Sequence, residues 1–305
     1  MADSSLTSAI DWLLAQQLPC GALPVSATDR RPYPEVTGYC LPTLIRAGRK
    51  DPAERGLRWL LDCQSDDGYW TGPDMATPYW FDTAVIAGHL LRLCLQFADH
   101  RDQCRRATAR AVDWLRRDLR DVLPPVQTAY HDPGAPQEIN LLGLALLGEI
   151  PEFSTGFSRW VADPATFSCA GKMQHFYCYL VEAVAWVDPI TACYFAGRFA
   201  RARGRDGSLF AYYRETQGAR LAPAAPWQCY PAIAQWATLW GRLGYRQAAE
   251  QAVCFLAARQ TANGGLTGGD GPYFPDQEIT WATKYYVDAC LTLLELPPQP
   301  MGAPG

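Results

Sequence analysis

The chain has 305 residues, of which 49% are apolar and 12% aromatic, and its net charge is −4. That length suits one large toroid or barrel and does not require two domains, and the apolar content is sufficient for a large core. The charges form no acidic or basic block, so neither nucleic acid nor an anionic membrane is indicated as a partner.

The N-terminal stretch MADSSLTSAIDWLLAQQ has no basic region followed by a long apolar run, so it does not read as a secretion signal. No run approaches 18 apolar residues, so no membrane span is expected. The 11 cysteines contain no CxxC pair and are odd in number, which is typical of reduced thiols. We therefore expect a cytoplasmic protein.

One motif is repeated along the chain. WLLAQQLPCGAL begins at Trp12, WLLDCQSDDGYW at Trp59 and FLAARQTANGGL at Phe255, and RDGSLF, which contains Gly207, is a weaker copy. In the three clear copies an aromatic residue is followed five positions later by Gln and four positions after that by Gly. Each copy predicts a helix that is closed by a turn with a positive-φ glycine.

The four copies and the spacing between their turns leave room for two more units, near 111–119 and 157–168. This predicts six units of roughly fifty residues in all. After each turn comes a segment that is apolar on nearly every side: PEVTGYCLPTLI, YWFDTAVIAGHLL, QEINLLGLALLG, MQHFYCYLVEAV, WQCYPAIAQWATLW and QEITWATKYYVDACL. A helix that is apolar all round is buried, whereas a helix with one apolar stripe faces water. We therefore predict an all-α fold, a closed (α/α)6 toroid over residues 1–296 with a disordered tail over 297–305. An open helical solenoid is the alternative.

The W-L-L-x-x-Q-x-x-x-G units resemble the repeats of the prenyltransferase and squalene-cyclase toroids. A narrower resemblance is to bacterial toroid proteins associated with polysaccharide biosynthesis, which carry segments similar to YPEVTGYCLPTLI, YWFDTAVIAGHL, HFYCYLVEAV and QEITWATKYYVDA. All four segments occur here in order. The resemblance implies the fold and a context of polysaccharide synthesis, but no particular reaction.

The inner helices of a closed toroid share one end, so the polar residues that open them should converge on a central cavity. These are Glu35, Asp82, Glu138, His175, Gln228 and Glu278. Further polar or aromatic residues follow on the same helix faces, at or near i+4 and i+7, and include Tyr39, His89, Tyr179, Glu182, Trp281, Tyr285 and Asp288, with Lys284 beside them. So many polar groups on apolar helices require a polar cavity or mutual pairing.

Two sets of candidate residues follow from this arrangement. The candidate catalytic residues are Glu35, Tyr39, Asp82, His175, Tyr179 and Glu278. The candidate substrate-binding residues are Trp80, Glu138, Trp227, Gln228, Trp281, Lys284 and Tyr285. Structural explanations compete with these roles: a carboxylate favours a helix start, Lys284 and Asp288 can form a buried ion pair, and His89 reads as a hydrogen-bonded core histidine.

Several kinds of chemistry lack their motifs. The region around His175 has no Asp-x-Cys zinc pair, Asp66 and Asp67 are only a pair in a turn, and no DDxxD sequence, P-loop, dinucleotide glycine pattern or Gly-x-Ser-x-Gly elbow occurs. We therefore expect neither a metal nor a cofactor. General acid–base chemistry by Glu, His and Tyr over aromatic rings is what remains, and it suits sugars.

Two reactions on a saccharide fit these residues. Two carboxylates could act as a glycosidase pair. Alternatively, His175 and Tyr179 could move a proton next to a uronate carboxylate that Lys284 or Arg31 neutralises, as in an epimerase or lyase. A small, nucleotide-linked or lipid-linked saccharide is the expected substrate. An isoprenoid cyclase or prenyltransferase with an aromatic cavity, and a non-catalytic scaffold that binds a glycan or a protein, are the alternatives.

The stretch RPYPEVTGYCLPTLI opens the first inner segment. Pro34 suits the start of a helix. Pro42 clashes with the carbonyl group of Gly38, which predicts a kinked helix whose Glu35 and Tyr39 face the cavity mouth.

Overall fold

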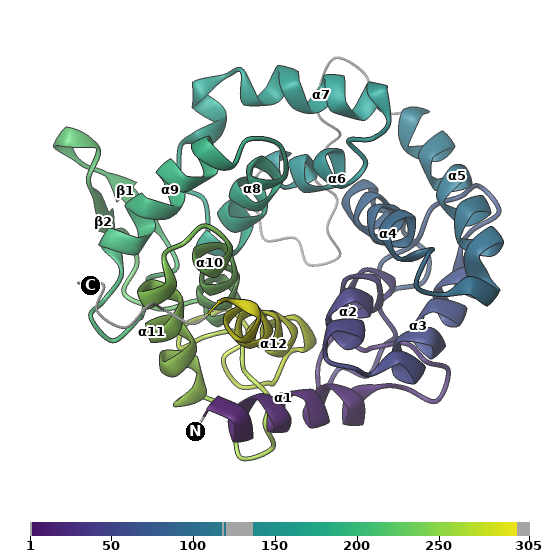
Figure 1. The fold of residues 1–305 in the computed structure, drawn as a ribbon, viewed down its shortest axis with the longest axis horizontal. Coiled ribbons are helices and arrows are strands. Elements are labelled where there is room, and N and C mark those ends of the chain that lie inside the picture. Colours follow the sequence, from purple (N-terminus) through teal and green to yellow (C-terminus); the bar gives the residue numbers. More distant parts are fainter. Residues whose placement is uncertain (1, 118, 120–136, 298–305) are drawn as a thin grey trace.

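The computed structural model describes residues 2–117, 119 and 137–297, and within them the helices form two concentric rings (Figure 1). The outer ring consists of α1 (Ala2–Gln16), α3 (Lys50–Cys63), α5 (Arg101–Arg117), α7 (Pro151–Val161), α9 (Pro189–Ala202) and α11 (Arg246–Ala257). The inner ring consists of α2 (Pro34–Arg46), α4 (Trp80–Leu93), α6 (Asn140–Leu146), α8 (Gln174–Val187), α10 (Tyr230–Arg242) and α12 (Thr280–Glu295).

The ring is closed between its two ends. α12 contacts both α2 and α1, and α1 also contacts α11. The predicted all-α (α/α)6 toroid is therefore confirmed, and the open solenoid is not formed. The short 3-10 helices are η1 (Ala98–His100), η2 (Gln137–Ile139), η3 (Pro164–Phe167) and η4 (Gln217–Ala219).

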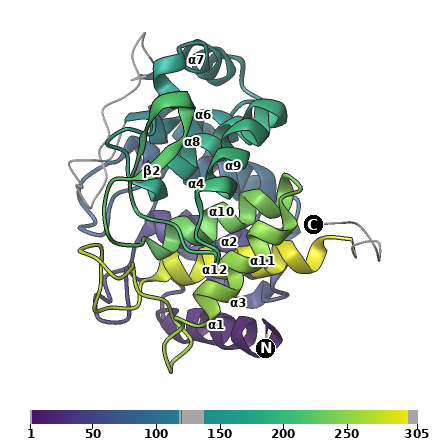
Figure 2. The ribbon, with the colours of Figure 1, turned by 90° about the vertical axis from the view of Figure 1, so that its left-hand side faces the viewer.

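The two faces of the toroid differ in their connections. Short connections lead from each inner helix to the next outer helix, and longer loops lead from outer to inner helices, as the side view shows (Figure 2). The strands β1 (Tyr213–Glu215) and β2 (Leu221–Pro223) form an antiparallel hairpin, with Tyr213 opposite Pro223, in one of these loops. The inner helices begin on the long-loop face, so their first side chains meet there.

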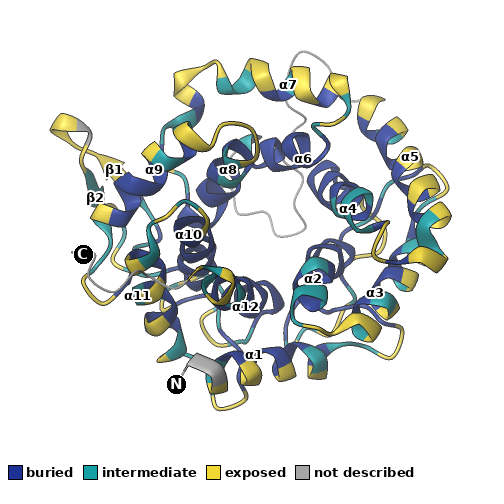
Figure 3. Cartoon of the chain, viewed as in Figure 1, coloured by how far each residue is buried: buried dark blue, intermediate teal, exposed yellow. Residues whose placement is uncertain are grey.

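Burial follows the two rings (Figure 3). The inner helices are buried on nearly every side, whereas the outer helices bury one stripe and expose the other. In α5, for example, Cys104, Ala111 and Leu115 are buried while Arg105 and Arg116 lie on the exposed side. This is the distribution that the apolar patterns predict. No helix in the described part of the chain has the length and apolarity needed to cross a bilayer.

The repeated glycines hold neighbouring units together. Gly68 has a φ of 100°, and a Cβ there would lie 2.3 Å from the main-chain oxygen of Arg110 in α5. Gly264 has a φ of 94°, and a Cβ there would lie 2.4 Å from the oxygen of Ser8 in α1. Only glycine tolerates both the positive φ and so close an approach.

The repeated glutamines make equivalent bridges. Gln64 Nε2 donates to the carbonyl oxygens of Gly68 and Ala107, at 2.8 and 2.9 Å. Gln260 Nε2 donates in the same way to Gly264 and Ser5, at 2.6 and 2.9 Å. Because Ser5 belongs to the first helix, the last copy of the motif closes the ring. In the weaker copy Arg203 stands in place of the glutamine and bonds Gln251 Oε1.

The first inner helix begins as expected and continues past its internal proline. Pro34 occupies the first turn of α2, and the helix is continuous through Pro42 to Arg46, so the proline does not end it. Gly38 has a packing role, because a Cβ there would lie 2.7 Å from Cγ1 of Ile86 in α4. The predicted tail over 297–305 lies, apart from Pro297, outside the described residues.

Candidate functional site

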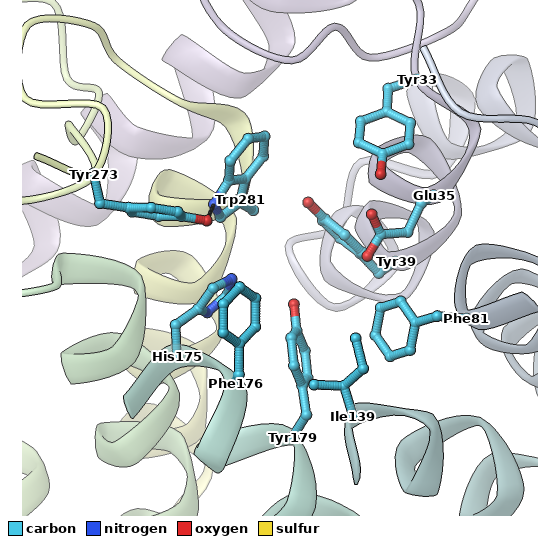
Figure 4. Close-up of a pocket in the computed structure, with 10 residues that line it drawn as sticks. All are labelled: Tyr33, Glu35, Tyr39, Phe81, Ile139, His175, Phe176, Tyr179, Tyr273 and Trp281. Atoms are coloured by element: carbon cyan, nitrogen blue, oxygen red, sulfur yellow. Dashed lines mark hydrogen bonds between the residues drawn. The ribbon is translucent and has the colours of Figure 1, made fainter. Parts of the chain in front are cut away.

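A small cavity, here called the first cavity, lies where the inner helices begin (Figure 4). Its volume is about 50 Å³, enough for a few water molecules. The side chains that line it come from α2, α4, α8, α12 and the loops before the inner helices: Tyr33, Glu35, Tyr39, Phe81, Ile139, His175, Phe176, Tyr179, Tyr273 and Trp281. Glu35, Tyr39, His175 and Tyr179 are thus brought together, as expected from their places on the inner helices.

Glu35 is the carboxyl group of this cavity, and only 8% of the residue is exposed. Burial raises its pKa to about 7, although a hydrogen bond from Tyr33 and the charge of Lys284 oppose that rise. Figure 4 shows the carboxyl group pointing into the same space as the hydroxyl groups of Tyr39 and Tyr179. Near neutral pH Glu35 can therefore hold a proton and donate it.

Asp82 lies behind this wall, fully buried, and does not line the cavity. Burial and the nearby charge of Glu35 raise its pKa well above the ordinary value. The Tyr33 hydroxyl group lies close enough to both carboxyl groups to lower the pKa of each. Neither Asp82 oxygen has a hydrogen bond of ordinary geometry within the described residues. Two coupled carboxyl groups in one dry region disfavour simultaneous ionisation, so an ionised Glu35 favours the protonated form of Asp82.

His175 is held in one tautomer by a residue of the next inner helix. Its Nδ1 lies 2.8 Å from Oε1 of Gln235, an amide oxygen that can only accept, so Nδ1 carries the proton and Nε2 has the free lone pair. Burial lowers the pKa of His175 to about 4, and the charge of Lys284 acts in the same direction. His175 is therefore neutral at physiological pH, with a basic nitrogen in the wall of the first cavity.

A larger cavity, here called the second cavity, lies on the other side of Glu35, Tyr39, Phe81 and Tyr179, which line both cavities. Its volume is about 230 Å³. The other residues that line it are Pro42, Arg46, Val85, His89, Arg92, Leu93, Leu142, Leu146, Glu182, Trp186, Arg242, Lys284, Tyr285 and Asp288. The two cavities adjoin at the four shared residues, here called the waist, and are together called the central channel.

Aromatic and basic groups hold that waist in place. The hydroxyl group of Tyr285 donates to that of Tyr179 over 2.9 Å, and the ring of Tyr285 stacks on Tyr39. Lys284 lies 4.0 Å from the ring centre of Tyr285 and pairs with Asp288 over 3.0 Å, the ion pair expected as its structural alternative. His89 lines the second cavity, and it forms no hydrogen bond to another described residue, unlike the core histidine that we expected.

Glu278 lies outside both cavities. It precedes the first residue of α12, and its carboxylate accepts hydrogen bonds from Nε1 of Trp12, over 2.8 Å, and from the Thr261 hydroxyl group. Glu278 was predicted to be a catalytic residue, but its position is outside the cavities that Glu35 and His175 line. Its side chain joins α1 to the turn after α11.

Four candidate substrate-binding residues also lie away from the channel lining. Glu138 pairs with Lys172 over 2.8 Å. Trp80 is buried in the core and its Nε1 donates to the Leu115 carbonyl group. Trp227 and Gln228 lie beside loop residues: Tyr212 packs edge-on against Trp227, and the main-chain N–H group of Gln228 donates to the Asp270 carboxylate. Trp281, Lys284 and Tyr285 do line the channel. Arg31, an alternative partner for a substrate carboxylate, pairs with Asp29 near the surface.

Several residues of the site were not singled out from the sequence. Tyr33 caps α2, and Tyr273 belongs to the loop before α12, where its hydroxyl group accepts from Trp281 Nε1 over 3.1 Å. Gln235 could have been found from the sequence, because it and Thr238 are the two polar residues in the largely apolar stretch YPAIAQWATLW. Among the described residues, no three His, Cys, Asp or Glu side chains lie close enough together to hold a metal ion.

Comparison with known proteins identifies the fold. The chain matches no family model and no curated protein sequence. A glycosidase solved in complex with glucose is similar, with a TM-score of 0.67 and 13% identity over 97% of this chain and 98% of that one. An α-amylase from Clostridium perfringens gives a TM-score of 0.69 with 10% identity, over 94% and 97% of the two chains.

A third similar structure is an inactive variant of an α-1,6-mannanase from Salegentibacter in complex with α-1,6-mannotriose. Its TM-score is 0.62 and its sequence identity is 12%, over 97% of this chain and 100% of that one. At such identities the similarity shows the toroid fold and not the activity. The resemblance to prenyltransferases and squalene cyclases, and the narrower one to toroid proteins of polysaccharide synthesis, stay predictions.

Proposed function

We propose that this protein is a carbohydrate-active enzyme that hydrolyses a glycosidic bond by general acid–base chemistry without a metal ion. The observation that carries the proposal is the pairing of two buried groups across one cavity: Glu35, whose pKa is raised to about 7, and His175, whose Nε2 is kept unprotonated. Near neutral pH, Glu35 can hold a proton to donate and His175 has a lone pair to accept one. Such a reaction requires both a donor and an acceptor.

The roles follow from where each group lies. The first cavity has room for a few waters and is walled by His175, so the attacking water would lie there. The saccharide would occupy the second cavity, where the rings of Tyr39, Tyr179 and Tyr285 offer stacking faces, with its reacting bond at the waist.

The proposed step conserves atoms and charge. The water oxygen attacks the anomeric carbon while Nε2 of His175 takes a water proton, and the bond from that carbon to the leaving oxygen breaks as Glu35 gives that oxygen its proton. The resulting imidazolium and carboxylate stabilise each other in a dry site, which compensates for the low pKa of the resting His175. Exchange with solvent water restores both groups. A single displacement of this kind inverts the anomeric centre.

Glycosidases among the similar solved structures support this choice of reaction class. The same residues would also serve an epimerase or lyase acting on a uronate, within polysaccharide synthesis. That route leaves a different product, an unsaturated or epimerised sugar, so product analysis separates the two.

The apolar residues of the second cavity favour one other candidate, an isoprenoid enzyme. Val85, Leu93, Leu142 and Leu146 line the channel together with the aromatic rings, and aromatic faces can stabilise a carbocation. A ligand screen decides between them, because a ligand that binds the folded protein raises its melting temperature. We expect oligosaccharides to raise it and the uncharged isoprenoid farnesol to have no effect.

Product analysis completes the test. Oligosaccharides that raise the melting temperature are incubated with the wild type, with His175→Ala and with Glu250→Gln, a control on the outer helix α11. We expect new reducing ends with the wild type and the control, unchanged by a chelator, and an inverted anomer as the first product in NMR spectra. Stabilisation by farnesol alone, or saccharide binding without any product, would contradict the proposal.

A further inference from the structure

The second cavity has more basic than acidic side chains in its wall. The basic residues are Arg46, Arg92, Arg242 and Lys284, and the acidic ones are Glu35, Glu182 and Asp288. The three arginines each lie in the last turn of an inner helix, namely α2, α4 and α10. Positive charge from three helices and from Lys284 on α12 therefore converges on one space.

The acidic groups do not neutralise this charge. Asp288 serves two basic partners, Arg46 at 3.2 Å and Lys284 at 3.0 Å, and Arg46 has a second acidic partner in Glu295 at 2.9 Å. Glu182 lies 3.9 Å from Arg242, and burial raises its pKa. Glu35 is half protonated near pH 7, since its pKa is raised to about 7. A surplus of positive charge remains at neutral pH.

Arg92 is the clearest part of that surplus. Its guanidinium group donates to the main-chain carbonyl groups of Gly88 and Leu146 and lies 5.0 Å from the ring centre of Trp186. It forms no ion pair with a carboxylate in the described part of the chain, although the charge of Glu149 acts on it and opposes the effect of burial on its pKa. Burial lowers the pKa of His89 in the same cavity, and the charges of Lys284 and Arg92 act in the same direction.

The cavity is accessible at one end. The side chain of Arg242 is 43% exposed, and Trp186 is 49% exposed, whereas that of Lys284, nearer the waist, is only 8% exposed. The negative ends of the helix dipoles favour basic residues in last turns, which explains the presence of the arginines. The dipoles do not require all three side chains to line the same cavity.

We propose that the second cavity binds the anionic group of an acidic saccharide, a carboxylate or a phosphate ester, with Arg92 and Arg242 as its main ligands. A guanidinium group binds either anion through two parallel hydrogen bonds. The inference rests on the proposed function for the sugar part of the ligand. It narrows the substrate class from any glycan to an acidic one.

Calorimetric titration at constant ionic strength tests this proposal. Glucuronate and glucose 6-phosphate are the two acidic probes, glucose is the neutral one, and inorganic phosphate reports anion binding without a sugar. The variants are Arg92→Gln and Arg242→Gln, with Arg105→Gln on the outer helix α5 as a control whose side chain is 63% exposed. Two variants are used because Arg92 also bonds the main chain and its replacement could affect folding.

We expect at least one acidic probe to bind more tightly than glucose, and the preferred probe identifies the anionic group. Each cavity variant should weaken that binding by about tenfold, and Arg105→Gln should leave it unchanged. Equal binding of glucose and both acidic probes, or unchanged binding in both cavity variants, would overturn the proposal.

A further variant separates this inference from the proposed function. Glu35→Gln removes the proton donor but no basic side chain, so it should bind the acidic probe as tightly as the wild type or more tightly. Acidic probes that bind without any saccharide being turned over would refute the proposed function alone. Turnover of neutral and acidic saccharides at equal kcat/KM would refute the anion-binding cavity alone.

Discussion

Nδ1 of His175 on α8 lies 2.8 Å from Oε1 of Gln235 on α10, and both residues are buried. This contact assigns the proton of a buried imidazole to one nitrogen and leaves the other facing the first cavity. Gln235 thus acts on the site through His175 and is a positioning residue.

Replacing Gln235 should change the pKa of His175. A carboxylate in Gln235→Glu would stabilise the imidazolium, so the pKa should rise from about 4 towards its ordinary value, whereas Gln235→Leu should not raise it. The measurement is the pH titration of the His175 ring proton by NMR. An equal His175 pKa in the two variants would show that Gln235 does not control the protonation of this ring.

The free energy of unfolding should depend on Glu35. Because its pKa is raised in the folded state, its contribution is fully present below its unfolded pKa of 4.5 and is lost as the pH rises through about 7. The shift corresponds to about 3 kcal/mol. Compared with Glu35→Gln, the wild type should therefore lose stability between pH 5 and pH 8. Urea unfolding at both pH values measures this. If the free energy of unfolding changed equally with pH in the two proteins, the pKa of Glu35 would not be raised by burial.

Glu278 should matter for stability and not for turnover. Glu278→Ala removes the acceptor for Nε1 of Trp12 and for the Thr261 hydroxyl group, which should cost about 1–3 kcal/mol. The measurements are urea unfolding and the kcat of the variant at a temperature where it is folded. A folded variant with wild-type stability and no turnover would restore Glu278 to the catalytic set.

The motif glycines should differ from an ordinary positive-φ glycine. Gly264→Ala places a Cβ 2.4 Å from the Ser8 oxygen, whereas Gly244→Ala, at a φ of 87°, meets nothing within 4 Å. The control should lose only about 1 kcal/mol of stability, and Gly264→Ala should lose clearly more because α1 must move away from the turn. Equal melting temperatures for the two variants would show that the turn does not hold the ring closed.

The fold was predictable because one physical pattern repeats. Gln17, Gln64 and Gln260 each stand four residues before a glycine, and the turn that they mark separates a striped helix from a buried one. With six such pairs, closure follows from the need to bury the inner helices on all sides. The register of the repeat therefore placed each inner helix, but not its first residue: Gln228 and Glu278, predicted to open their helices, precede α10 and α12.

The site was predictable only where side chains stand on a helix. Glu35, Tyr39, His175 and Tyr179 lie inside α2 and α8, so helical spacing fixed their direction. Glu278 precedes α12 and pairs its backbone with Thr267, and that extended conformation turns its side chain towards Trp12. Such loop contacts depend on tertiary packing, and so do partners from another helix such as Gln235. Residue spacing within one helix does not predict them.

Glycan cleavage by Glu35→Gln tests the central claim most directly. The rate of reducing-end release is measured for this variant and the wild type near pH 6, where Glu35 is protonated, on an oligosaccharide that stabilises the wild type. We expect the wild type to cleave it and the folded variant to be slower by roughly 100- to 10,000-fold, the usual contribution of a general acid. Equal rates for the two proteins would contradict the claim.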